Sequence, residues 1–292
     1  MTAISTTAHP RMWLGVVVAL AAAAGYAVAN TSASVAYQAG SDPMTVAATR
    51  FLVPTVALIV WLRLSGVPLT LPSRDAILGV LLGLVTALYT FAVLRSFNML
   101  PFALAVLIFY LFPLIAAVIA VGFGLEKFNW KTGAAIVLAL IGLALALNVR
   151  GGNLDPFGVA LAFLAAVGLA VVIVVSSRLF GGGDPRPLTL YMAAAASVFL
   201  LIVCAASGDF VLPQTPTGWI GFAASSVLYG FAMITFFIAV SMIGPVRASL
   251  LSYADAVISA GLGVVVLGQA LTVIQVVGIV VVIIALIGAT LR

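Results

Sequence analysis

Residues 101–127 read PFALAVLIFYLFPLIAAVIAVGFGLEK, and no charged side chain occurs among them before Glu126. A helix needs roughly 20 apolar residues to cross the hydrocarbon core of a bilayer, so this stretch predicts a transmembrane helix. Similar apolar stretches fill the rest of the chain, separated by turns rich in Gly, Pro and charge. The ten predicted spans are about 12–38, 45–64, 75–97, 102–123, 131–149, 156–179, 187–207, 217–242, 246–267 and 272–291.

The composition agrees with a bundle surrounded by lipid. Of the 292 residues, 65% are hydrophobic and 7% are charged, whereas soluble domains carry roughly 25% charged residues. The net charge of +5 does not indicate a nucleic-acid partner, because the basic residues are scattered singly. The only cysteine, Cys204, lies in an apolar run, and the only histidine, His9, lies in the N-terminal tail. We therefore expect no metal site and no cofactor.

The basic residues predict the orientation of the bundle. With ten spans, both ends of the chain lie on one side, and nine of the twelve Lys and Arg residues fall on that side. They are Arg11, Arg63, Arg74, Lys127, Lys131, Arg178, Arg186, Arg247 and Arg292. Cytoplasmic segments are enriched in Lys and Arg, so we predict that both termini are cytoplasmic. We place the protein in the inner (plasma) membrane of a bacterial cell.

Rarer residues recur in one order at an offset of 143 or 144, which predicts an internal duplication. The matches include Gly15 with Gly158, Gly25 with Gly168, Pro101 with Pro245, Tyr110 with Tyr253, and Glu126 with Gln269. Each half holds five spans, and an odd number reverses the direction of the second copy in the membrane. We predict a cytoplasmic tail at 1–11 and two inverted five-helix repeats, 12–149 and 150–292, around a central cavity.

These repeated motifs also resemble those of a known family. Pro101, Tyr110, Pro113, Glu126 and Gly133 are similar to the later part of an EamA-type repeat, where a proline-containing helix ends at a Gly-Glu-like turn. Pro245, Tyr253, Gly268-Gln269 and Gly278 follow the same order. The resemblance covers the whole chain and implies the drug/metabolite transporter superfamily, most closely the YddG-type aromatic amino-acid exporters. The second half departs from the pattern at Gln269, at Ala256 in place of Pro113, and in lacking a match for Arg50.

Polar and aromatic side chains inside the spans are the candidates for substrate binding, because polar groups at this depth tend to face a wet interior. Tyr26 and Asn30 are one helical turn apart on the first span, although a helix–helix hydrogen bond explains them equally well. Tyr89 and Tyr229 lie midway along their spans, where an interfacial aromatic belt does not account for them. The full predicted set is Tyr26, Asn30, Tyr89, Phe109, Tyr110, Tyr229, Phe237, Tyr253 and Asp255.

Charged residues inside the spans are few. Asp255 is the only carboxylate well within a span, and we predict that it binds a substrate amino group or carries a proton; the alternatives are a structural pair with Arg50 and a satisfied hydrogen-bond cluster. Arg50 and Arg95 lie one or two turns in from the outer side; the two interpretations are a site for a substrate carboxylate and an interfacial anchor, and we favour the anchor for both. Glu126 is interpreted as a solvated helix end.

The sequence favours a transporter and not an enzyme. It contains no Walker A motif and no Gly-x-Ser-x-Gly or His-Glu-x-x-His motif. The resemblance implies export or facilitated movement of amino acids, aromatic and hydrophobic ones included, by alternating access, with small-molecule substrate and lipid bilayer as partners. The alternatives are an exporter of other metabolites, purines or cationic drugs, and a membrane enzyme or assembly factor without transport activity. The oligomeric state is left open, and a monomer is compatible with the pattern.

Overall fold

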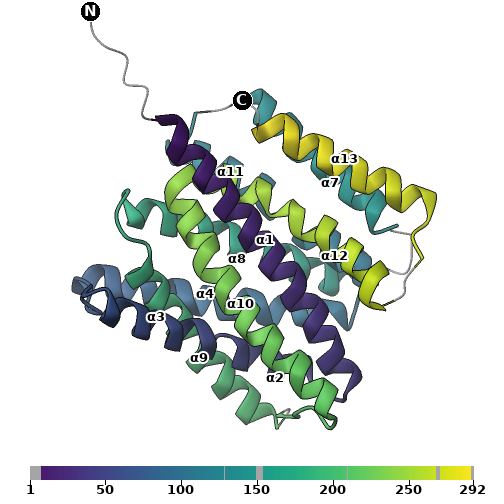
Figure 1. Ribbon diagram of the computed structural model, residues 1–292, viewed down its shortest axis with the longest axis horizontal. Coiled ribbons are helices and arrows are strands. Elements are labelled where there is room, and N and C mark those ends of the chain that lie inside the picture. Colours follow the sequence, from purple (N-terminus) through teal and green to yellow (C-terminus); the bar gives the residue numbers. More distant parts are fainter. Residues whose placement is uncertain (1–7, 128, 149–153, 209, 268–269, 291–292) are drawn as a thin grey trace, which may run out of the picture.

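The computed structural model describes residues 8–127, 129–148, 154–208, 210–267 and 270–290, and every regular element in these ranges is an α-helix (Figure 1). In chain order the helices are α1 (Ala8–Gln38), α2 (Pro43–Arg50), α3 (Leu52–Leu64), α4 (Ser73–Phe97), α5 (Phe102–Phe109), α6 (Phe112–Gly122), α7 (Trp130–Ala146), α8 (Pro156–Phe180), α9 (Arg186–Ser207), α10 (Pro216–Ile243), α11 (Pro245–Leu251), α12 (Tyr253–Leu267) and α13 (Val273–Thr290).

These helices form the ten predicted spans. Three spans are broken helices, namely α2 with α3, α5 with α6, and α11 with α12. In the described ranges, eight spans of 21 to 28 residues are apolar enough to cross a membrane, and α7 and α13 are two shorter apolar helices. The predicted all-α, ten-helix membrane fold is confirmed. The expected boundary between the repeats, at residues 149 and 150, lies outside the described residues.

Short polar side chains and prolines set where several helices begin. Asp42 accepts hydrogen bonds from the backbone N–H groups of Met44 and Thr45 at the start of α2. Asp155 caps α8 in the same way, and Thr215 caps α10. Each of these caps is followed by a proline, whose missing N–H costs nothing in the first turn of a helix.

Two of the three helix breaks follow from proline. Pro54 has no N–H to offer the carbonyl of Arg50, and α2 ends at Arg50. Pro113 stands in the same relation to Phe109, and α5 ends there. The third break, at Ser252, has no such proline. There the Ser252 hydroxyl donates to the carbonyl oxygen of Ala248 at 3.3 Å, a back-bond of the kind that bends helices.

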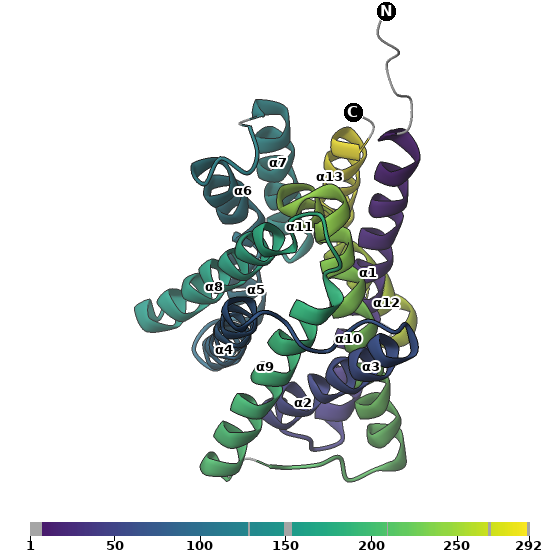
Figure 2. The same cartoon turned by 90° about the vertical axis from the view of Figure 1, so that its left-hand side faces the viewer.

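The two halves are intertwined, and each gives its first helix to the other half. Helix α1 packs against α10 and α12, whereas α8 packs against α4 and α6. Figure 2 shows the resulting two groups, with α4, α5, α6 and α8 on one side and α1, α10 and α12 on the other. Any site between these groups is therefore built from both repeats.

The glycines that recur at the offset of 143 mark equivalent helix crossings. A Cβ atom added at Gly15 would collide with Ile243 and Met242 at the end of α10. A Cβ atom at Gly158 would meet Met99 at 2.8 Å, just after the end of α4. Glycine allows these close approaches because it has no side chain. The predicted duplication thus appears as repeated packing in three dimensions.

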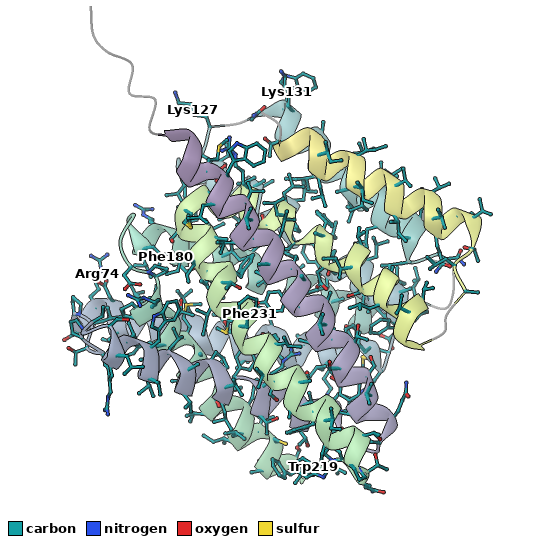
Figure 3. The ribbon with its side chains drawn as sticks, in the orientation of Figure 1. Arg74, Lys127, Lys131, Phe180, Trp219 and Phe231 are labelled. Atoms are coloured by element: carbon teal, nitrogen blue, oxygen red, sulfur yellow. The ribbon has the colours of Figure 1, made fainter. Side chains whose placement is uncertain are left out.

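The last helix of each half lies at the edge of the bundle. Helices α7 and α13 pack mainly against one another (Figure 1). Gly142 and Gly278 face each other where they cross, so the two backbones come close together. The first turn of α1 and the last turn of α13 lie at one end of the molecule, the end where Figure 3 labels Lys127 and Lys131.

The two ends of the bundle are packed differently. At the end that carries Lys127, α6 packs against α11 (Figure 3). The equivalent pair in the inverted repeat is α12 and α5, and the described parts of these two helices make at most marginal contact. Trp219 marks this opposite end in Figure 3. The described helices therefore close one end of the bundle more completely than the other.

The surface is apolar over most of the spans. Leu64 and Val265 are more than four-fifths exposed, and in water such side chains would drive aggregation. The four tryptophans, Trp13, Trp61, Trp130 and Trp219, are all exposed, as expected for residues of an interfacial belt. A lipid-facing surface explains both observations.

Candidate functional site

The carboxylate of Asp255, in the first turn of α12, accepts hydrogen bonds from two hydroxyl groups. Tyr110 Oη donates to Oδ2 at 2.9 Å, and Ser259 Oγ donates to Oδ1 at 3.1 Å. Ser259 is one turn further along α12, whereas Tyr110 belongs to the first half of the chain. Asp255 remains partly accessible, and each carboxylate oxygen retains acceptor capacity for a further donor.

The break between α5 and α6 meets the break between α11 and α12. Tyr253 Oη donates to the backbone carbonyl oxygen of Tyr110 at 2.8 Å. The two phenol rings stack, with centroids 5.7 Å apart and planes at 28°. Tyr253 is completely buried. We call this paired contact, together with the Tyr110–Asp255 hydrogen bond, the tyrosine lock. It joins the two repeats at positions that are equivalent in the duplication.

A second cluster lies around Tyr229, the middle residue of α10. The guanidinium carbon of Arg50 is 4.1 Å from the centroid of the Tyr229 ring. Tyr26 and Phe51 each meet the same ring edge to face, at centroid distances of 5.3 and 5.2 Å. Tyr26 also contacts Phe236. The cluster places the cation of α2 among aromatic rings from α1, from α10 and from Phe51, the residue between α2 and α3.

Tyr26 connects the two clusters. It lies within electrostatic reach of Tyr229, Tyr89, Arg50 and Asp255. The ring centroids of Tyr89 and Phe109 are 6.4 Å apart, and Phe109 in turn meets Tyr110 edge to face at a centroid distance of 6.2 Å. Seven of the nine predicted residues, namely Tyr26, Tyr89, Phe109, Tyr110, Tyr229, Tyr253 and Asp255, therefore form one continuous neighbourhood at the centre of the bundle.

Asn30 lies apart from this neighbourhood, and Phe237 reaches only its edge, through the ring of Phe236 that contacts Tyr26. Asn30 is exposed, one turn beyond Tyr26 on α1. Phe237 is buried and packs edge to face on Phe180, the last residue of α8. Eight residues along α10 separate Phe237 from Tyr229, or about 12 Å of helix axis. Phe237 thus fills the bundle near the end that carries the termini.

Two sequence interpretations need correction. Arg50 is not paired with Asp255, whose oxygens are taken up by Tyr110 and Ser259, and its guanidinium lies inside the bundle rather than at an interface. Glu126 is not simply solvated. Its Oε1 accepts the backbone N–H of Val246 at 3.2 Å, at the start of α11. The linear sequence gave no signal for a contact between these two turns.

Glu126 lies outside the spans, and its surroundings change its acidity. Burial raises the pKa of the carboxyl group above its ordinary value, and the Val246 N–H and the charge of Arg247 offset part of that rise. Gly244, with φ of +83°, faces the same oxygen: a Cβ atom there would lie 2.9 Å from Oε1. The carboxylate therefore caps α11 through a turn that only glycine adopts without strain.

An apolar cleft of about 270 Å³ opens at the side of the bundle, between α1, α12 and α13. Trp13, Leu20, Ile258 and Ile287 are among its lining residues, and none of the predicted polar residues lines it. Within the described ranges, no group of His, Cys, Asp and Glu side chains is arranged to hold a metal ion.

Comparison with known proteins identifies the architecture. The model of the EamA-like transporter family matches residues 13–148 and again residues 156–291. A solved crystal structure aligns over 95% of this chain and 98% of its own length, with a TM-score of 0.81 and 22% sequence identity, which shows a shared fold alone. No curated protein matches the chain. Two copies of the family's unit thus cover nearly the whole sequence, and this multi-pass membrane protein belongs to the EamA-like transporter family.

Proposed function

We propose that the protein moves amino acids, aromatic and other hydrophobic ones included, across the inner membrane of a bacterium by alternating access. Both termini are cytoplasmic in this proposal, and the movement is export or facilitated movement. The positive-inside distribution of Lys and Arg supports the orientation. The proposed substrate site is the central neighbourhood of Tyr26, Tyr89, Phe109, Tyr110, Tyr229, Tyr253 and Asp255.

The observation that carries the proposal is the partly accessible carboxylate of Asp255 at the meeting point of two broken helices. A carboxylate inside an apolar bundle is costly unless it has a partner or a task. Its two hydrogen bonds come from neutral hydroxyl groups, so its negative charge has no hydrogen-bonded counter-charge. An ammonium group satisfies both the charge and the remaining acceptor capacity.

The surroundings of Asp255 favour a substrate with an apolar body. The ring of Tyr110 lies next to the carboxylate, Phe109 packs against Tyr110, and Tyr89 lies beyond Phe109. Aromatic side chains offer large flat surfaces on which an apolar or aromatic group packs. An ammonium group attached to such a body is the common feature of hydrophobic amino acids and of cationic amines.

The unequal ends of the bundle support alternating access. Inverted repeats allow the two ends to exchange their packing, with a site between them at the midplane. Here α6 and α11 are in contact at the end with the termini, and the Glu126–Val246 hydrogen bond joins the same two regions. The contact between α12 and α5 is the one expected to form when the protein changes state.

The test is transport of radiolabelled phenylalanine into proteoliposomes that contain unlabelled phenylalanine, with and without a proton gradient. Asp255→Asn should abolish most of the exchange, whereas Asp75→Asn, the same change in the first turn of α4, should leave it intact. Purines and cationic amines in the same assay test the alternative cargoes. Wild-type protein that exchanges no amino acid above empty liposomes would refute the proposal.

A further inference from the structure

The charge of Arg50 lies at the middle of the bundle, although the residue is only eight positions from the start of its span. Its guanidinium carbon is 4.1 Å from the ring of Tyr229, and Tyr229 is halfway along the 28-residue helix α10. An arginine that serves as an interfacial anchor extends its side chain toward the headgroups. Arg50 instead extends inward and rests on an aromatic face.

This cation has no anion beside it. In the described part of the chain, the one ion pair joins Arg186 to Asp184, far along the sequence in the turn before α9. The Nε atom of Arg50 is buried, and no described residue accepts a hydrogen bond from it. The aromatic face of Tyr229 attracts the cation but does not accept its hydrogen bonds in the plane of the guanidinium.

The charged and titratable groups around Arg50 do not supply the missing partner. The groups within its electrostatic reach are the phenols of Tyr26, Tyr37, Tyr89 and Tyr229. On its own helix, Asp42 is engaged by the backbone N–H groups at the start of α2. Asp255 is engaged by Tyr110 and Ser259. A buried Nε–H group left without an acceptor indicates a partner that comes from outside the chain.

A second polar atom near Tyr229 is also unsatisfied. Ser225 lies one turn before Tyr229 on the same face of α10, and it is completely buried. No described residue forms a hydrogen bond with its hydroxyl oxygen. The unpartnered Ser225 hydroxyl and the unpartnered Nε–H group of Arg50 together match the needs of a carboxylate, which accepts several hydrogen bonds.

We propose that Arg50 binds the carboxylate group of the transported solute and thereby determines specificity. The planar guanidinium presents a fork of N–H donors that fits a carboxylate, and Tyr229 fixes its orientation before the solute arrives. Together with Asp255, which also lies within electrostatic reach of Tyr26, Arg50 selects zwitterionic amino acids over cationic amines, which lack the carboxylate. This last step rests on the proposed function; carboxylate binding by Arg50 does not.

The experiment compares three probes that share a phenyl ring: phenylalanine, 3-phenylpropionate, which has only the carboxylate, and phenethylamine, which has only the ammonium. Binding is measured in detergent as ligand-induced thermal stabilisation, and transport is measured in proteoliposomes. The variants are Arg50→Gln, Arg50→Lys and the control Arg95→Gln. The guanidinium carbon of Arg95 also lies over an aromatic ring, 5.2 Å from the centroid of Phe91, but Arg95 is exposed at the end of α4.

We expect Arg50→Gln to weaken the binding of phenylalanine and 3-phenylpropionate about 10- to 100-fold, the range for losing charged hydrogen bonds. The binding of phenethylamine should be unchanged or tighter. Arg50→Lys keeps the charge and should restore part of the carboxylate binding, which a purely structural role for the guanidinium would not predict. Arg95→Gln should behave as the wild type with all three probes.

The outcomes separate this proposal from the one on which it builds. If the wild type is stabilised by 3-phenylpropionate in an Arg50-dependent manner but moves no amino acid, the amino-acid function fails and the carboxylate site stands. If the wild type moves phenylalanine and Arg50→Gln moves it equally well, the carboxylate site is overturned and the function stands. Equal losses for all three probes, or a wild type that neither carboxylate stabilises, also overturn the assignment of Arg50.

Discussion

Removing one hydroxyl from the tyrosine lock, in Tyr253→Phe, should measure how much the lock stabilises the fold. The hydroxyl donates to the Tyr110 carbonyl at 2.8 Å, and among the described residues no backbone N–H donates to that oxygen. The break before Pro113 leaves the carbonyl without a helical partner. Phenylalanine keeps the stacked ring but leaves a buried acceptor unsatisfied, which costs about 1–3 kcal/mol.

The measurement is unfolding in detergent micelles, followed by circular dichroism across a series of denaturant concentrations. Tyr191→Phe is the matched control, because it makes the same chemical change at a hydroxyl with no hydrogen bond to a described residue. Phenylalanine transport by Tyr253→Phe should also fall, since the ring of Tyr110 that holds Asp255 loses an anchor. A variant as stable as the wild type, within about 0.5 kcal/mol, would refute the assignment of this hydrogen bond to the lock.

Three further changes test other parts of the structure. Gly278→Ala places a Cβ atom 2.5 Å from the carbonyl oxygen of Gly142 and should destabilise the protein by about 1–3 kcal/mol in thermal unfolding. Gly288→Ala, on the same helix but with open space around it, is the control and should leave the stability unchanged. Burial raises the pKa of Glu126 above its ordinary 4.5, so its stabilising contribution is present below pH 4.5 and is lost as the pH rises through the raised pKa. The wild type should therefore lose stability relative to Glu126→Gln across that window, and a constant difference would contradict the burial of the carboxyl group. Tyr89→Ala should weaken the binding of phenylalanine about 2- to 12-fold more than the binding of the amino acid alanine, as expected for the loss of one aromatic contact. An equal loss of affinity for both amino acids would place Tyr89 outside the site.

The spans were predictable because the cost of burying charge in lipid constrains a sequence directly. The ends of a span are clear where a turn or a long apolar run marks them, as at Gly244-Pro245 and from Phe102 to Gly122. The bend at Pro113 was also predictable, because a missing N–H acts on a carbonyl four residues away. The break at Ser252 was not, because it arises from a weak back-bond and a tyrosine of the same broken span reaching across to the other half.

The interior position of most candidate residues was predictable, but their partners were not. Depth counted along a span suggested that Tyr89, Tyr229 and Asp255 face the interior, and the structure brings them into one neighbourhood. Counting residues from the end of the span misplaced Arg50, because that count assumes a straight helix and a side chain that extends toward the nearest membrane interface. Glu126 was misread because its partner, Val246, belongs to the other repeat. Contacts between the repeats depend on the crossing of helices, which no single span encodes.

The tyrosine lock has a consequence for the history and the engineering of this duplicated chain. Tyr110 and Tyr253 occupy equivalent positions, but two residues further on the first half has Phe112 where the second has Asp255. Two copies of the first half would assemble the stacked rings without any carboxylate, and two copies of the second would bring two carboxylates together. A homodimer of either half therefore does not reproduce the centre of the present molecule. The two halves are therefore not interchangeable at this point, because only the second supplies the carboxylate.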